Sequence, residues 1–195
     1  TAEAAVTEKE EAVENAKTAL EEKETAYQEA QDKLAELDEN YKQAVEATRA
    51  AQEKVNSAQE AVNSAQSALS SAQATLSSTP STIPETRTGT SADGTTYTYT
   101  VQVPNPAYAA AQQAVKEAEA NLAEKEKELQ AAQEELQKCK DAEQKALDAV
   151  NTQKEEVAQA KQAVEDAQQQ LEEAEQALKT AEEELEKAQQ EVEKA

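Results

Sequence analysis

Residues 150–178 read VNTQKEEVAQAKQAVEDAQQQLEEAEQAL, and they show most clearly the pattern that predicts the fold. A large apolar residue returns at every seventh position, namely Val150, Val157, Val164, Leu171 and Leu178. An alanine stands three residues after each of the last four. Two core positions per heptad, separated by three and then four residues, form the buried stripe of a coiled coil, which we call the seam.

The same seam extends over both arms of the chain. In the first arm its large positions are Val6, Val13, Leu20, Tyr27, Leu34, Tyr41, Thr48, Val55, Val62, Leu69 and Leu76. In the second arm they are Tyr108, Val115, Leu122, Leu129, Leu136, Glu143 and then Val150 onward to Val192. Only Thr48 and Glu143 interrupt the two series. We therefore predict an all-α fold, a long two-helix antiparallel coiled-coil hairpin with an Ala-rich heptad seam and a small β-hairpin at its tip.

Composition excludes most enzyme classes. The 195 residues include no His, one Cys, two Gly, and 41 acidic against 19 basic residues, for a formal net charge of −22. Without His there is no Ser–His–Asp triad, Cys–His dyad or His-based metal site, and two glycines exclude a Gly-rich phosphate loop. The acidity opposes binding to nucleic acid or an anionic membrane. We expect no enzymatic activity, cofactor, metal ion, nucleic-acid partner or direct membrane insertion.

An antiparallel fold-back fixes an approximate register. It places Leu76 near Tyr108, and each arm of about 80 residues would make a rod roughly 115–130 Å long. Leu185 and Val192 are then left without partners in the first arm. We therefore expect this sequence to be part of a longer chain.

The two seam interruptions fall at one level in this register. Tyr41 lies opposite Glu143, and Thr48 lies opposite Leu136. We expect Tyr41 to fill the space beside Glu143, with its hydroxyl near the carboxylate, within a looser or kinked segment. Such a segment either fixes the register, as single polar core residues do in other coiled coils, or forms a binding site.

Residues 79–106, TPSTIPETRTGTSADGTTYTYTVQVPNP, interrupt the heptads and contain every proline and glycine of the chain. We expect Pro80 and Pro84 to end the first helix, because proline lacks an N–H and clashes with the preceding turn. The second helix should open at Asn105 or Pro106. The predicted parts are a first coiled-coil helix at 1–78, a β-hairpin tip at 79–106 and a second coiled-coil helix at 107–195.

The break itself has the pattern of a β-hairpin. Residues 95–103 alternate Tyr and Val on one face with Thr and Gln on the other, in strongly β-favouring residues. Residues 85–90 can pair with them across a turn at 91–94, where Asp-Gly is a turn signal. An isolated two-stranded ribbon is marginal in water, so the hairpin should lean on the helix ends or associate with another copy.

Charge is sparse around this hairpin. Between Val55 and Val115 the acids and bases, tyrosines apart, are only Glu60, Glu85, Arg87 and Asp93. Tyr and Arg are enriched at binding hot spots. The candidate partner-binding residues of the tip are Arg87, Asp93, Tyr97, Tyr99 and Tyr108. The alternative is that Tyr97 and Tyr99 only shield the end of the seam.

Two further features have structural explanations. Cys139 occupies a small-residue seam position, where we expect it to pack. The run Glu182–Glu184 points its carboxylates in different directions around a helix, so it forms a solvated face and not a cation cage.

Four segments resemble the alanine-rich coiled-coil regions of Gram-positive surface proteins: EKEEAVENAKTAL at 8–20, AQEKVNSAQEAVNSAQSAL at 51–69, AEANLAEKEKELQAAQEEL at 118–136 and VAQAKQAVEDAQQQLEEAEQAL at 157–178. Antigen I/II-like, M-like and choline-binding adhesins carry such regions. The resemblance covers both arms, lies in composition and heptad style, and transfers no functional residue. It implies an extracellular location on the bacterial cell surface.

Three functions follow as expectations. The first is an adhesion or interaction module whose β tip contacts a host or neighbouring-cell protein or glycan. The second is a purely structural stalk or spacer between domains. The third, by resemblance, is a regulatory coiled coil of a secreted peptidoglycan hydrolase. We expect a monomer, because the net charge of −22 opposes lateral association, with tip-to-tip contact between copies as the alternative.

Overall fold

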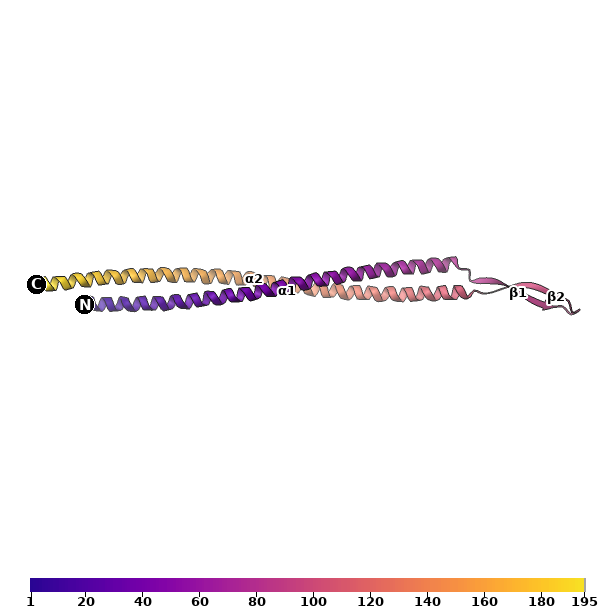
Figure 1. Cartoon of the computed structure of the whole chain (residues 1–195), viewed down its shortest axis with the longest axis horizontal. Helices are drawn as coiled ribbons and strands as arrows, with labels where there is room; N and C mark the ends of the chain where they lie inside the picture. The colour runs from indigo at the N-terminus through magenta and orange to yellow at the C-terminus, as the bar shows by residue number, and fades with distance from the viewer. Residues whose placement is uncertain (195) are drawn as a thin grey trace. The chain divides into compact units, whose positions relative to one another are not determined.

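A computed structural model describes residues 1–194 of the chain. The order of elements is α1 (Ala2–Ser78), β1 (Thr82–Thr90), β2 (Thr96–Pro104) and α2 (Pro106–Lys194) (Figure 1). The two long helices pack together, and a two-stranded antiparallel β-hairpin lies between them in sequence. The predicted helical hairpin with a small β-hairpin is therefore confirmed. Ala195, the last residue of the predicted second helix, lies outside the described residues.

The chain divides into two compact units that cut across both helices. Unit 1 contains Thr1–Val45 and Asp141–Ala195, so it holds the first part of α1 and the last part of α2. Unit 2 is the continuous segment Glu46–Lys140, which holds the remainder of both helices together with the strands. In each unit a segment of α1 runs beside a segment of α2 (Figure 1).

In each unit an ion pair joins α1 to α2. In unit 1 the Lys33 Nζ lies 3.5 Å from Glu156 Oε2, and in unit 2 the Lys54 Nζ lies 2.8 Å from Glu135 Oε1. From the first pair to the second, α1 advances by three heptads and α2 falls back by three, as antiparallel helices require. Both pairs are exposed, so they report the register and contribute little to stability.

The seam forms the core of both units. Ala51 is 1 % exposed and Val150 is 2 % exposed, so small and large seam positions are buried alike. Every buried apolar side chain within residues 1–194 lies on the seam, namely Val13, Ala51, Val62, Ala65, Ala111, Leu136, Val150, Ala167 and Ala181. Burial of a Val or Leu side chain contributes about 1.5–3 kcal/mol, which makes the seam the main source of stability.

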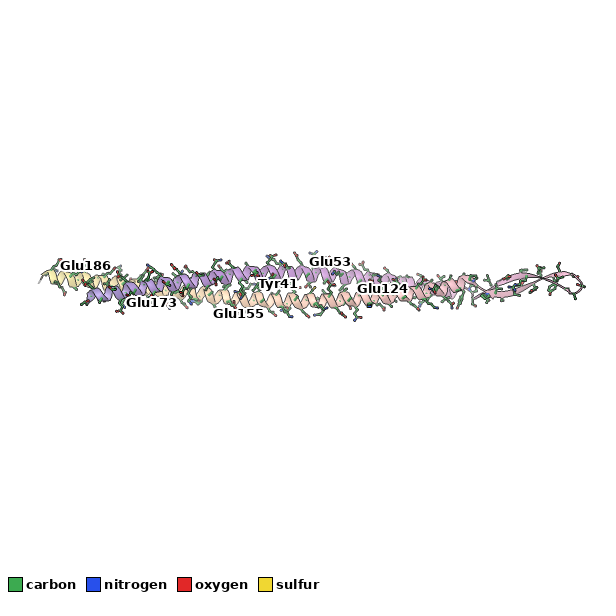
Figure 2. The ribbon with its side chains drawn as sticks, turned by 90° about the horizontal axis from the view of Figure 1, so that it is seen from below. Tyr41, Glu53, Glu124, Glu155, Glu173 and Glu186 are labelled. Atoms are coloured by element: carbon green, nitrogen blue, oxygen red, sulfur yellow. The ribbon has the colours of Figure 1, made fainter. Side chains whose placement is uncertain are left out.

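Charged side chains occupy the opposite faces of the helices. The exposed glutamates labelled in Figure 2 are Glu53, Glu124, Glu155, Glu173 and Glu186. The helices are therefore amphipathic in the sense that the heptad pattern predicts.

The two residues expected to lack seam partners differ in exposure. Val192 is 77 % exposed, whereas Leu185 is half-buried.

A buried glutamine replaces alanine at one small seam position in unit 1. Gln153 is 2 % exposed, and its Nε2 donates to the backbone carbonyl of Ala30 on α1, at 3.2 Å. This is a hydrogen bond across the seam between the two helices. Since a displaced helix would leave the amide buried without this partner, Gln153 favours the observed register.

The level of Tyr41 and Glu143 differs in part from expectation. Both side chains are half-buried. The structure shows no hydrogen bond between the Tyr41 hydroxyl and the Glu143 carboxylate within the described residues. α1 and α2 are helical without interruption at this level.

Thr48, the polar interruption of the first series, has a buried hydroxyl. Its Oγ1 has no hydrogen-bond partner, although other helical threonines, such as Thr25, donate to the carbonyl four residues earlier. A buried polar group without a partner costs about 1–3 kcal/mol of desolvation. Thr48 is thus a local weak point of the seam in unit 2.

Replacing Thr48 by valine, which has the same shape, should therefore stabilise the protein. We expect Thr48→Val to raise the free energy of unfolding by roughly 1–2 kcal/mol, measured by urea denaturation followed by circular dichroism. Thr25→Val is the matched control, because the Thr25 hydroxyl is exposed and bonded at 2.9 Å to the Glu21 carbonyl. An equal or lower stability of Thr48→Val would contradict this account of the seam.

Candidate functional site

The end of α1 is set by hydroxyl groups. The Thr79 hydroxyl donates to the Thr75 carbonyl at 2.7 Å, and the Ser78 hydroxyl donates to the same carbonyl at 3.0 Å. These bonds satisfy a carbonyl that has no partner in a following helical turn. Pro80 then prevents the helix from continuing.

Asn105 joins the strands to the start of α2. Its Nδ2 donates to the Pro80 carbonyl at 2.7 Å, and its backbone N–H donates to the Ser81 carbonyl at 2.9 Å. Its Oδ1 accepts the Ala107 N–H at 3.0 Å, so Asn105 is the N-cap of α2 and Pro106 is its first residue. The predicted opening of the second helix is confirmed, and one side chain ties the chain entering the hairpin to the chain leaving it.

β1 and β2, with the turn between them, form a two-stranded sheet that we call the β ribbon, residues 82–104. The strands pair antiparallel over nine residues each, from Thr82 opposite Pro104 to Thr90 opposite Thr96. β1 begins earlier than predicted, and Pro84 does not end the first helix: it lies within β1, opposite Gln102. Proline is tolerated there because the pair of Pro84 and Gln102 is one whose backbone groups point away from the partner strand, so the missing N–H costs no bond between the strands.

The turn of the β ribbon follows the Asp-Gly signal. The Gly94 N–H donates to the Ser91 carbonyl at 2.9 Å, and Gly94 adopts a φ of 83°, which glycine accepts without strain. The Asp93 Oδ1 accepts the Thr95 N–H at 3.0 Å. This backbone hydrogen bond lowers the pKa of the Asp93 carboxyl. Asp93 therefore stabilises the turn as a carboxylate.

One face of the β ribbon presents two tyrosines side by side. The rings of Tyr97 and Tyr99 have centroids 5.9 Å apart and are inclined by 39°. Tyr97 is 53 % exposed and Tyr99 is 43 % exposed. Tyr97 lies opposite Gly89, where a Cβ would meet its Cζ at 2.8 Å, so the ring lies across the glycine. The Tyr97 ring can lie there because residue 89 has no side chain.

Arg87 lies directly opposite Tyr99 on the same face. Its Nε is 3.0 Å from Glu85 Oε1, two residues away along β1. Both side chains of this ion pair are about half exposed. Because Arg87 retains exposed guanidinium surface beside the two rings, the face combines aromatic area with a hydrogen-bond donor. We call this surface the tyrosine face.

The opposite face of the β ribbon consists mainly of threonine. Three cross-strand pairs place threonine against threonine, at Thr86–Thr100, Thr88–Thr98 and Thr90–Thr96. All six residues are exposed. The two faces of the β ribbon therefore differ in chemistry, so a substitution on one face can be compared with a matched substitution on the other.

The structure brings together only some of the candidate residues. Arg87, Tyr97 and Tyr99 share the tyrosine face, whereas Asp93 lies in the turn. Tyr108 is half-buried in the first turn of α2, at the first large seam position. The sequence reasoning missed Ile83, 38 % exposed on the tyrosine face, because β1 was expected to begin after it.

The described residues 1–194 contain no group of three or more His, Cys, Asp or Glu placed to hold a metal ion. In that part of the chain, neither helix has an apolar stretch long enough to cross a membrane. Comparisons with protein-family models, with curated proteins and with solved structures find no match.

Adding a methyl group at Gly89 should displace the Tyr97 ring without unfolding the protein. The clash involves only the far end of a flexible side chain, so we expect Gly89→Ala to change the free energy of unfolding by less than ~1 kcal/mol. Nuclear Overhauser contacts between the Tyr97 ring and residue 89 should be lost. Thr88→Ala, on the opposite face, should preserve them, and their persistence in Gly89→Ala would contradict the described packing.

Proposed function

We propose that this chain is an extracellular coiled-coil module of a bacterial surface protein that presents the β ribbon to a protein or glycan partner. The observation that carries the proposal is the exposure of the two paired rings, 53 % for Tyr97 and 43 % for Tyr99. Large aromatic side chains at the surface of a folded domain have a cost in water that a binding partner removes.

The chemistry of the tyrosine face supports recognition. Tyrosine offers a large rigid apolar ring with a hydroxyl that donates and accepts hydrogen bonds, and it has little conformational freedom to lose. Arg87, opposite Tyr99, adds a planar cation of the kind enriched at hot spots. By contrast, the exposed helix faces of both units carry mainly Glu, Lys, Gln, Asn and Ser, which are well solvated.

A stalk without a partner is the second candidate function. The Tyr97 ring lying across Gly89 favours it, because that contact already shields part of the ring within the chain. The stalk requires no exposed recognition group, however, and both rings keep about half of their surface in contact with solvent. The third candidate is the regulatory coiled coil of a peptidoglycan hydrolase, which inhibition of such an enzyme by this chain would support.

The test is binding of the labelled protein to a panel of host matrix proteins, mucins and glycans. For any partner found, we expect the double variant Tyr97→Ala/Tyr99→Ala to weaken binding by roughly tenfold or more, as loss of an interface hot spot does. The matched control is Thr98→Ala/Thr100→Ala, which changes the same strand on the other face and should bind like the parent.

Three outcomes separate the candidates. Loss of binding only in the tyrosine variant supports recognition by the tyrosine face. Equal binding by all three proteins would place the site on the helices. No binding by the parent to any member of the panel would favour the stalk.

A further inference from the structure

We propose that the outer edge of β2 pairs antiparallel with the outer edge of β2 in a second copy of this chain, so that two β ribbons form one four-stranded sheet. The proposal rests on three properties of β2: its outer backbone groups are free, it carries no charge, and its sequence is complementary to itself. The proposal goes beyond recognition by the tyrosine face, because it uses the backbone edge and not the rings.

The backbone hydrogen bonds show which groups of β2 are free. The Ser91 N–H donates to the Thr95 carbonyl and the Asn105 N–H to the Ser81 carbonyl, so the odd-numbered pairs of the register are the hydrogen-bonded ones. In an antiparallel ladder these alternate with pairs whose backbone groups point outward. The N–H and C=O groups of Thr96, Thr98, Thr100 and Gln102 therefore face the open edge of β2.

The two edges of the β ribbon are not equivalent. On β1 the same rule directs Pro84 outward, and proline has no N–H to donate. β1 also carries the charged pair Glu85 and Arg87. Proline and charge are the devices by which natural edge strands avoid pairing, and β2 has neither between Thr96 and Val103. The β2 edge is thus the one left open to another strand.

β2 is complementary to itself. When two copies overlap over the full strand, Thr100 meets Thr100 of the second copy at the symmetry axis. In this register Tyr97 lies opposite Val103 of the second copy, and Tyr99 lies opposite Val101. Outward-facing residues meet outward-facing residues, so the backbone groups of Thr98, Thr100 and Gln102 pair, whereas Pro104, opposite Thr96, has no N–H to donate. Aromatic and β-branched pairs are favourable cross-strand neighbours.

Electrostatics and sheet size both favour a second copy at this edge. The net charge of −22 opposes association along the helices, but residues 79–106 contain only two acids and one base. A two-stranded ribbon is marginal alone, whereas three or more strands are the usual minimum for a stable sheet. Pairing through β2 supplies four strands, with the tyrosine faces of both copies on one side.

The test is the mass of the protein in solution, by sedimentation equilibrium over a wide range of concentration. We expect the parent to approach twice its 21.0 kDa chain mass. Thr100→Pro removes an outward N–H of β2 without removing a bond to β1, and it should be monomeric. Thr86→Pro, directly opposite on β1, is the matched control and should dimerise like the parent.

A crosslinking measurement decides the case even if a proline variant loses its β ribbon. In a Cys139→Ser background, Thr100→Cys should form an intermolecular disulfide under mild oxidation, since paired Cα atoms lie about 5.5 Å apart. Thr86→Cys, on the other edge, should not. A parent that stays monomeric, a dimeric Thr100→Pro, or equal crosslinking at positions 86 and 100 would each overturn the proposal.

Discussion

Burial of small and large side chains alike along the seam holds the two helices together. Ala51 and Ala65 are as thoroughly buried as Val62 and Val150, at 1–4 % exposure. An alanine contributes little apolar area itself, so its burial is useful only when the partner helix approaches closely enough to fill the space. The heptad spacing brings such positions back to the same face of each helix, and the acidic surface is left to solvent.

Most of this helical architecture could be predicted from the sequence, because the seam is a local repeat with one dominant physical cause. The end of α1 and the start of α2 agree with Pro80, Asn105 and Pro106, whose chemistry acts within one turn. The hydrogen bond from Gln153 to the Ala30 carbonyl and the unpartnered hydroxyl of Thr48 could not be predicted. Both depend on which side chain the partner helix places opposite, and a heptad pattern allows more than one such arrangement.

The β ribbon shows the same division between local and non-local effects. Its turn and the alternation of β2 follow from the Asp-Gly and Tyr-Thr patterns, but the extension of β1 through Pro84 depends on pairing with β2. The tyrosine face was only partly predictable for that reason. Ile83 lies on it because β1 pairs with β2 from Thr82 onward, whereas Tyr108 lies at a seam position of α2. A signal was available at Gly89, because a glycine within a strand often marks close approach by another group.

The most direct test of the seam is a pair of neighbouring substitutions in unit 2. Ala51 is 1 % exposed, whereas Ala50 is exposed, so Ala51→Leu and Ala50→Leu make the same chemical change on and off the seam. Overpacking should lower the free energy of unfolding of Ala51→Leu by about 1–3 kcal/mol. Ala50→Leu should stay within about 0.5 kcal/mol of the parent. Equal stabilities of the two variants in urea denaturation would contradict the central role of close packing at the seam.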